Sequence, residues 1–165
     1  MGEINNLKQN IVQLNDGHYC VEYTFDGGSG QKFYNATHEL YQKKQEYTME
    51  DGTVLAYVED YDNNKIRHRV TTIIDTTKQK SIIEAFFDAS GFCTDIYNRT
   101  KEGNTFVEYR YDLRGFDDRE GKFFGYNPCE KIVNKGLPIE TRCKYLYNLD
   151  GTVSEVWTNV LGEKI

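Results

Sequence analysis

A short segment repeated five times constrains this 165-residue chain more than any other feature. Each copy begins with a charged residue, continues through a run typical of a β-strand, and is followed closely by glycine. The copies are EYTFD (22–26), EYTME (46–50), EAFFD (84–88), EYRYD (108–112) and KYLYN (144–148). Because each copy can bury its apolar side chains only by packing against its neighbours, the repeat predicts a β-rich domain of stacked hairpins.

The spacing of the copies predicts that the chain is internally duplicated. The steps between the second residues of successive copies alternate between short and long, at 24, 38, 24 and 36 residues. FYNAT (33–37) also recurs in the same register as IYNRT (96–100). We therefore expect one domain over 1–165, with a duplicated β-repeat region over 18–165 and repeats near positions 22, 46, 84, 108 and 144.

Strand periodicity predicts how the repeats are arranged in a sheet. Within each copy the second and fourth residues should share one face, and the charged first residue should point to the other. The Asp-Gly pairs at 51–52 and 150–151 are typical of tight hairpin turns, and the glycine-rich stretch at 27–30 predicts a looser turn. We predict an all-β fold in which antiparallel hairpins form a twisted sheet or a sandwich of about ten to twelve short strands.

The N-terminal residues follow a different period. Ile4, Leu7, Ile11 and Leu14 are spaced as on a short amphipathic helix, and the Asn-Asp-Gly sequence at 15–17 is typical of a helix end. We therefore expect a short helix over 3–14 that caps an open end of the sheet.

The motif Tyr-x-Tyr-Asp-x-x-Gly resembles the YD repeat of the RHS family. EYRYDLRG (108–115) matches it best, KYLYNLDG (144–151) follows, and the resemblance extends over most of 22–157. Bacterial RHS proteins wind long β-sheets into shells around toxin domains, so the resemblance implies a β-hairpin sheet or a structural fragment of such an assembly. The family period is uniform, whereas the period here alternates, and five copies are too few to close a shell. The chain also resembles the tyrosine-rich hairpins of bacterial MORN-like repeats.

Charge and cysteine content restrict the partners and the compartment. The net charge of −6 and the pI near 5.1 disfavour nonspecific binding to nucleic acid or to an anionic membrane, because both need a basic surface. The four cysteines are scattered without a Cys-x-x-Cys motif, and residues 1–16 contain no apolar stretch typical of a secretion signal. We predict a cytoplasmic protein with reduced thiols, with disulfides or a zinc site as the alternatives.

No motif for catalysis, metal binding or cofactor binding is evident. His18, His38 and His68 are isolated in the sequence and lack the spacing of metal ligands. DYDNN (60–64) has the alternating oxygen ligands of a calcium loop but lacks its glycine and its glutamate. We therefore predict no metal and no cofactor and favour a non-catalytic protein. A hydrolase or a small-ligand-binding β-barrel with an unrecognised site is the alternative.

The sequence favours a protein-binding module with two sets of candidate contact residues. Aromatic anchors supply much of the energy of protein interfaces, and the last two repeats are richest in tyrosine. The tyrosine candidates are Tyr109, Tyr111, Tyr145 and Tyr147. The acidic candidates, which either face a basic partner or form an ordinary solvated face, are Glu22, Glu46, Glu84 and Glu108. The class includes bacterial toxin-neutralising proteins and phage proteins that block host defences.

Overall fold

The computed structural model describes residues 7–114 and 127–165. These two ranges contain twelve strands, one short 3-10 turn, η1 (Asn15–Gly17), and no α-helix. The strands are β1 (Lys8–Gln13), β2 (Tyr19–Phe25), β3 (Gly28–Tyr34), β4 (Leu40–Thr48), β5 (Val54–Asp62), β6 (Lys65–Ile74), β7 (Lys80–Phe87), β8 (Cys93–Glu102), β9 (Thr105–Asp112), β10 (Glu130–Val133), β11 (Thr141–Tyr147) and β12 (Val153–Asn159).

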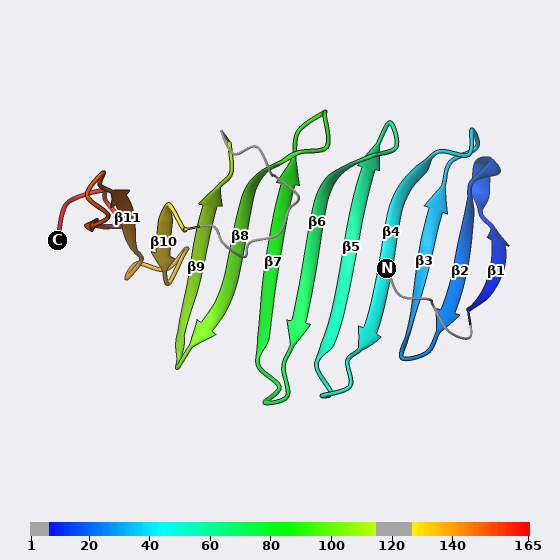
Figure 1. Ribbon diagram of the computed structural model, residues 1–165, viewed down its shortest axis with the longest axis horizontal. Helices are drawn as coiled ribbons and strands as arrows, with labels where there is room; N and C mark the ends of the chain where they lie inside the picture. Colours follow the sequence, from blue (N-terminus) through cyan, green and yellow to red (C-terminus); the bar gives the residue numbers. More distant parts are fainter. Residues whose placement is uncertain (1–6, 115–126) are drawn as a thin grey trace.

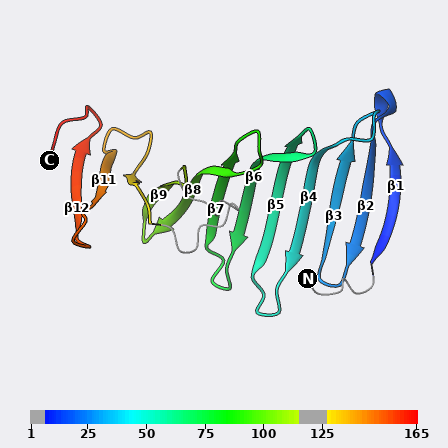
Figure 2. The ribbon, with the colours of Figure 1, turned by 45° about the horizontal axis from the view of Figure 1, so that its top comes forward.

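All twelve strands belong to one open sheet, in which each strand pairs with the next along the chain (Figure 1). β1 and β12 are the two edges of this sheet. The sheet twists along its length, so that β11 and β12 are turned relative to β4 and β5 (Figures 1 and 2). The predicted all-β fold of antiparallel hairpins is confirmed, and the hairpins form one sheet and not a sandwich of two.

The helix predicted over 3–14 is wrong where the structure describes it. Residues Lys8–Gln13 form β1, which pairs antiparallel with β2 and places Ile11 opposite Val21. Pairing with β2 satisfies the backbone groups on one side of β1, and this outweighs the marginal stability of so short a helix. The apolar stripe that indicated a helix is not buried, since Ile11 is 62% exposed. Positions 3–6 of the predicted helix lie outside the described residues.

The Asp or Asn and the glycine that end two of the repeats, Asp88 with Gly91 and Asn148 with Gly151, belong to one kind of five-residue turn. In six such turns the amide of the first residue donates to the carbonyl of the fifth, and the amide of the fourth donates to the carbonyl of the first. The side chain at the first position can accept further bonds, as Asp88 does from the amides of Ser90 and Phe92. The fourth residue has a positive φ in every case. The six turns lie at 35–39, 49–53, 75–79, 88–92, 148–152 and 159–163. The first repeat ends differently, since Phe25 pairs with Gly28 and leaves only residues 26 and 27 between the strands.

The glycine-rich stretch at 27–30 is not the loose turn that the sequence predicts, because Gly28 and Gly30 lie within β3. Tyr23 lies opposite Gly30 in the register, and a Cβ atom on Gly30 would approach the Tyr23 ring to 2.3 Å. The Tyr23 side chain extends over β3, and its hydroxyl donates to Oε1 of Gln45 on β4 at 2.7 Å. Glycine at position 30 therefore allows the Tyr23 ring to lie over β3. The ring covers the backbone at a position where β3 has no side chain of its own to pack.

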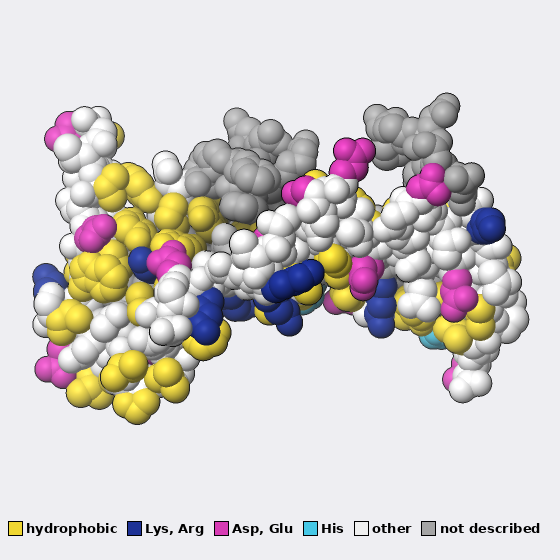
Figure 3. All heavy atoms as spheres, turned by 90° about the horizontal axis from the view of Figure 1, so that it is seen from below, with side chains coloured by type: hydrophobic (Ala, Val, Ile, Leu, Met, Phe, Trp, Pro, Cys, Tyr) yellow, Lys and Arg dark blue, Asp and Glu magenta, His cyan; other side chains and the backbone are white. Residues whose placement is uncertain are grey.

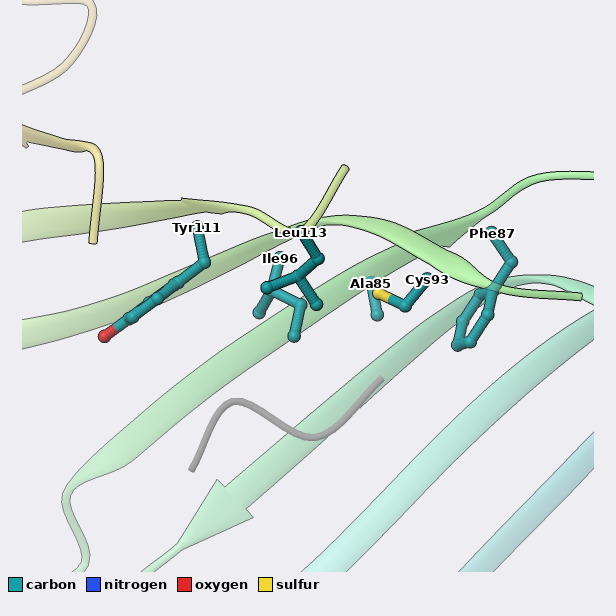
Figure 4. Packing of buried hydrophobic residues seen from close by; sticks show 6 residues of the cluster. All are labelled: Ala85, Phe87, Cys93, Ile96, Tyr111 and Leu113. Atoms are coloured by element: carbon teal, nitrogen blue, oxygen red, sulfur yellow. The ribbon is translucent and has the colours of Figure 1, made fainter. Parts of the chain in front are cut away.

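The pairing register assigns the side chains to two faces, as the alternation of the repeats predicts. Face A carries the second residue of each repeat: Tyr23, Tyr47, Ala85, Tyr109 and Tyr145. Face B carries the first residue: Glu22, Glu46, Glu84, Glu108 and Lys144. The main apolar core lies on face A near the middle of the sheet, contributed by β7, β8, β9 and the residue that follows β9 (Figure 4). It consists of Ala85, Phe87, Cys93, Ile96, Tyr111 and Leu113.

Candidate functional site

The groups that most often carry catalysis are engaged in structural contacts. The His18 ring packs against Tyr41, and His38 accepts or donates a bond at 3.1 Å to the Tyr19 hydroxyl. All four cysteines are free thiols, and burial raises the pKa of three of them, at positions 20, 129 and 143, which disfavours a nucleophilic thiolate. Within 7–114 and 127–165 no three His, Cys, Asp or Glu residues are grouped so as to hold a metal ion. The same residues include no helix with the length and apolar character needed to cross a membrane.

A continuous ladder of charged groups crosses face B from β5 to the turn after β10. His68 on β6 lies between Asp60 and Glu84, at 3.3 Å and 2.6 Å from their carboxylate oxygens. Arg99 on β8 then joins Glu84 at 2.8 Å to Glu108, and Lys135 reaches the second oxygen of Glu108 at 3.0 Å. Burial alone would raise the pKa of the Glu84 carboxyl, but the hydrogen bonds from His68 and Arg99 hold it below its usual value.

The four glutamates of the predicted acidic set all lie on face B, but they have two different environments. Glu84 and Glu108 belong to the charged ladder, and Glu108 is only 3% exposed. Glu22 and Glu46 are exposed and stand at the rim of a groove of about 510 Å³. Its lining combines small side chains, such as Ala56 and Thr72, with larger ones, and it includes one cation, Lys44. Two of the four carboxylates are therefore accessible to a partner, and two already have cations beside them.

The four tyrosines of the predicted aromatic set lie on face A and differ in exposure. Tyr111 is buried in the core cluster, and Tyr109 is half-buried, with its hydroxyl donating to Glu102 at 2.9 Å. Tyr145 and Tyr147 lie side by side on β11, with ring centroids 6.5 Å apart. Tyr147 is 47% exposed, and its hydroxyl donates to the carbonyl of Pro128. The structure thus leaves the pair on β11 more accessible than the pair on β9.

Apolar side chains are concentrated at the C-terminal end of the sheet (Figure 3). The face A side chains of β12 lie beside the two tyrosines of β11. They are Val153, Glu155 and Trp157. Glu155 lies opposite Tyr145 in the register and accepts a hydrogen bond at 3.1 Å from the indole of Trp157. These five residues form what we call the C-terminal apolar surface: Tyr145, Tyr147, Val153, Glu155 and Trp157.

Face B has a second groove that the sequence analysis missed. It has a volume of about 510 Å³ and lies where the ends of β7, β8, β9 and β10 meet the turns beside them. We call it the basic groove, because five of its lining residues are cationic: Lys78, Lys80, Arg99, Lys101 and Lys135. These residues form no run in the sequence, and only the register of four strands and two turns brings them together.

A scan against protein-family models finds no match to the chain, and a comparison with curated protein sequences finds none either. The resemblance to RHS and MORN-like repeats therefore stays a prediction from the motif.

Proposed function

We propose that this domain is a non-catalytic protein-binding module that contacts its partner through the C-terminal apolar surface. The observation that carries the proposal is the arrangement around Glu155, an exposed residue that lies opposite Tyr145 in the register and accepts a hydrogen bond from the Trp157 indole. A carboxylate among aromatic side chains suits an arginine or lysine side chain, because the carboxylate attracts the charged head and the rings can pack against the apolar stem. The partner that fits is a protein whose surface carries a basic residue within an apolar patch.

This chemistry is consistent with a protein that neutralises a bacterial toxin or blocks a host defence protein by covering a basic surface. Such partners are commonly basic because they act on nucleic acid, and the acidic net charge of −6 favours their approach. The open sheet supports the same proposal, because it presents a broad face from rigid elements and not from mobile loops.

The replacements Tyr145→Ala and Glu155→Gln are each expected to weaken partner binding by more than about 1 kcal/mol, roughly fivefold in Kd, while the fold remains intact. The partner is first isolated by crosslinking and affinity capture from the cells in which the chain occurs, and its Kd is then measured by calorimetry. Tyr47→Ala is the matched control, since Tyr47 is a half-buried tyrosine on face A at the other end of the sheet. Equal affinity of all three variants for the partner would contradict the proposal.

The double charge reversal Glu22→Lys/Glu46→Lys is expected to slow association without lowering thermal stability. These two glutamates are exposed, so they contribute little to the fold but add to the field that attracts a basic partner. The measurement is the association rate by stopped flow over a range of salt concentrations. A rate that responds neither to salt nor to the reversal would show that the surface around Glu22 and Glu46 is an ordinary solvated one.

A further inference from the structure

The basic groove combines cations with an apolar floor. Ile82 of β7, Phe106 of β9 and Ile132 of β10 line it together with the five cationic side chains. Phe106 is 64% exposed, and the ammonium group of Lys101 lies 5.6 Å from the centroid of its ring. A volume of about 510 Å³ is within the range of sites that take small organic ligands. The groove therefore offers an apolar contact and several positive charges at one place.

Only part of the positive charge of the groove is cancelled by carboxylates, because Arg99 and Lys135 form ion pairs and the other three cations form none with the described residues. Glu108 is the one carboxylate among its lining residues, and both of its oxygens are already engaged, by Arg99 and by Lys135. Lys78, Lys80 and Lys101 have no carboxylate within 4.0 Å in the part of the chain that the structure describes. A concentration of unpaired cations in a protein of net charge −6 is the opposite of what composition predicts.

The turn at 75–79 holds part of the groove in a conformation that its sequence does not favour. Lys78 has a φ of 69°, at the position where four of the six equivalent turns have glycine. Oδ1 of Asp75 accepts bonds from the amides of Thr77 and Gln79, and the Gln79 side chain donates to the carbonyl of Lys101. These bonds fix the position of Lys78 at the rim of the groove; the left-handed conformation itself belongs to the turn type, since His38 has a φ of 65° in the equivalent turn at 35–39.

We infer that the basic groove binds a small amphipathic organic anion, independently of the protein-binding function proposed above. The apolar part of the ligand lies on Ile82, Phe106 and Ile132, and its carboxylate or phosphate group is bound by the lysines. A peptide strand fits less well, because β7, β8 and β9 are hydrogen-bonded on both sides and cannot accept a further strand. Nucleic acid fits less well too, because the groove at the other end of face B is flanked by Glu22 and Glu46.

The ligand class can be tested with three probes that share one ring system. 1-Naphthyl phosphate, 1-naphthoate and 1-naphthol carry a phosphate, a carboxylate and an uncharged hydroxyl group, and their binding to the whole chain is followed by calorimetry and NMR. We expect at least one anion to bind about tenfold more tightly than 1-naphthol. Raising NaCl from about 20 mM to about 500 mM should weaken the binding of the anion and leave that of 1-naphthol unchanged. The stronger of the two anions identifies the head group. Equal binding of all three probes, or binding of none, would overturn the inference.

Two variants locate the binding. Lys80→Glu/Lys101→Glu is expected to reduce the affinity for the bound anion by about tenfold or more, since both side chains are exposed and line the groove. Phe106→Ala should weaken all three probes, because it removes an apolar contact that they share. The matched control Lys65→Glu/Lys164→Glu changes the net charge equally at exposed sites outside the groove, and should alter the affinity by less than about twofold. An equal loss in the control would show a general charge effect and refute the site.

Discussion

Replacing Ile96 by alanine is expected to lower the free energy of unfolding by about 3 kcal/mol. Ile96 is fully buried in the face A core and lies between Ala85 and Tyr111, its cross-strand neighbours on β7 and β9. The described residues form a single sheet, in which few positions are fully buried. No second sheet of these residues packs on Ile96 and could move in to fill the cavity that the lost side chain leaves. The measurement is urea unfolding, with the midpoint and the slope fitted separately.

Ile11→Ala is the matched control for this replacement. Ile11 is the same residue type in a strand of the same sheet, but it is 62% exposed and lies on the edge strand β1. Its replacement should cost less than about 1 kcal/mol, because little buried area is lost. Equal losses for the two variants would mean that burial on face A does not hold the middle of the sheet together.

The strands and turns of the repeats could be predicted because their signals are local. Alternation within EYRYD places Glu108 and Tyr109 on opposite faces whatever the neighbouring strand is. The Asp and Gly of a turn such as 88–92 act within five residues, through side-chain bonds and a positive φ. A single sequence is therefore enough to predict the alternation within a strand and the position of such a turn.

Features that depend on a neighbouring strand could not be predicted. The N-terminal residues have a weak helical period, and only the edge of β2 makes them a strand. β3 has two glycines and reads as a turn until Tyr23 is placed across Gly30. Whether Glu108 faces a partner or Arg99 depends on the register between β8 and β9, and the same register brings Lys101 to Phe106. A short segment of sequence does not determine which residue of the neighbouring strand it will pair with, and that register is fixed only when the strands come together in the sheet.

Removing the positive charge from Arg69 is expected to destabilise the protein by about 3 kcal/mol, because it leaves a buried carboxylate without its cation. Glu59 on β5 is only 6% exposed, and one of its oxygens accepts two bonds from Arg69, at 2.9 and 3.0 Å. The Arg69 guanidinium also lies 5.4 Å from the centroid of the Phe87 ring, which belongs to the core. Arg69→Met keeps an unbranched apolar stem beside Phe87 but removes the charge, and with it both the ion pair and the cation–π contact, so its loss of stability, measured by urea unfolding, contains both contributions.

A double-mutant cycle separates the charge from the packing. If the uncompensated Glu59 carboxylate is the cause, Glu59→Gln/Arg69→Met will be more stable than Arg69→Met alone, since the neutral amide is less costly to bury. Arg67→Met on the same strand is the control. Its ion pair with Asp62 at 3.7 Å is between exposed side chains and its bond to the Phe87 carbonyl is long, at 3.4 Å, so its replacement should cost less than about 1 kcal/mol. A double variant no more stable than Arg69→Met would instead assign the loss to the Phe87 contact. Glu59 and Arg69 lie on the same face as the core cluster, so a more stable double variant would mean that a sheet with so few buried apolar residues depends on its buried charges being paired.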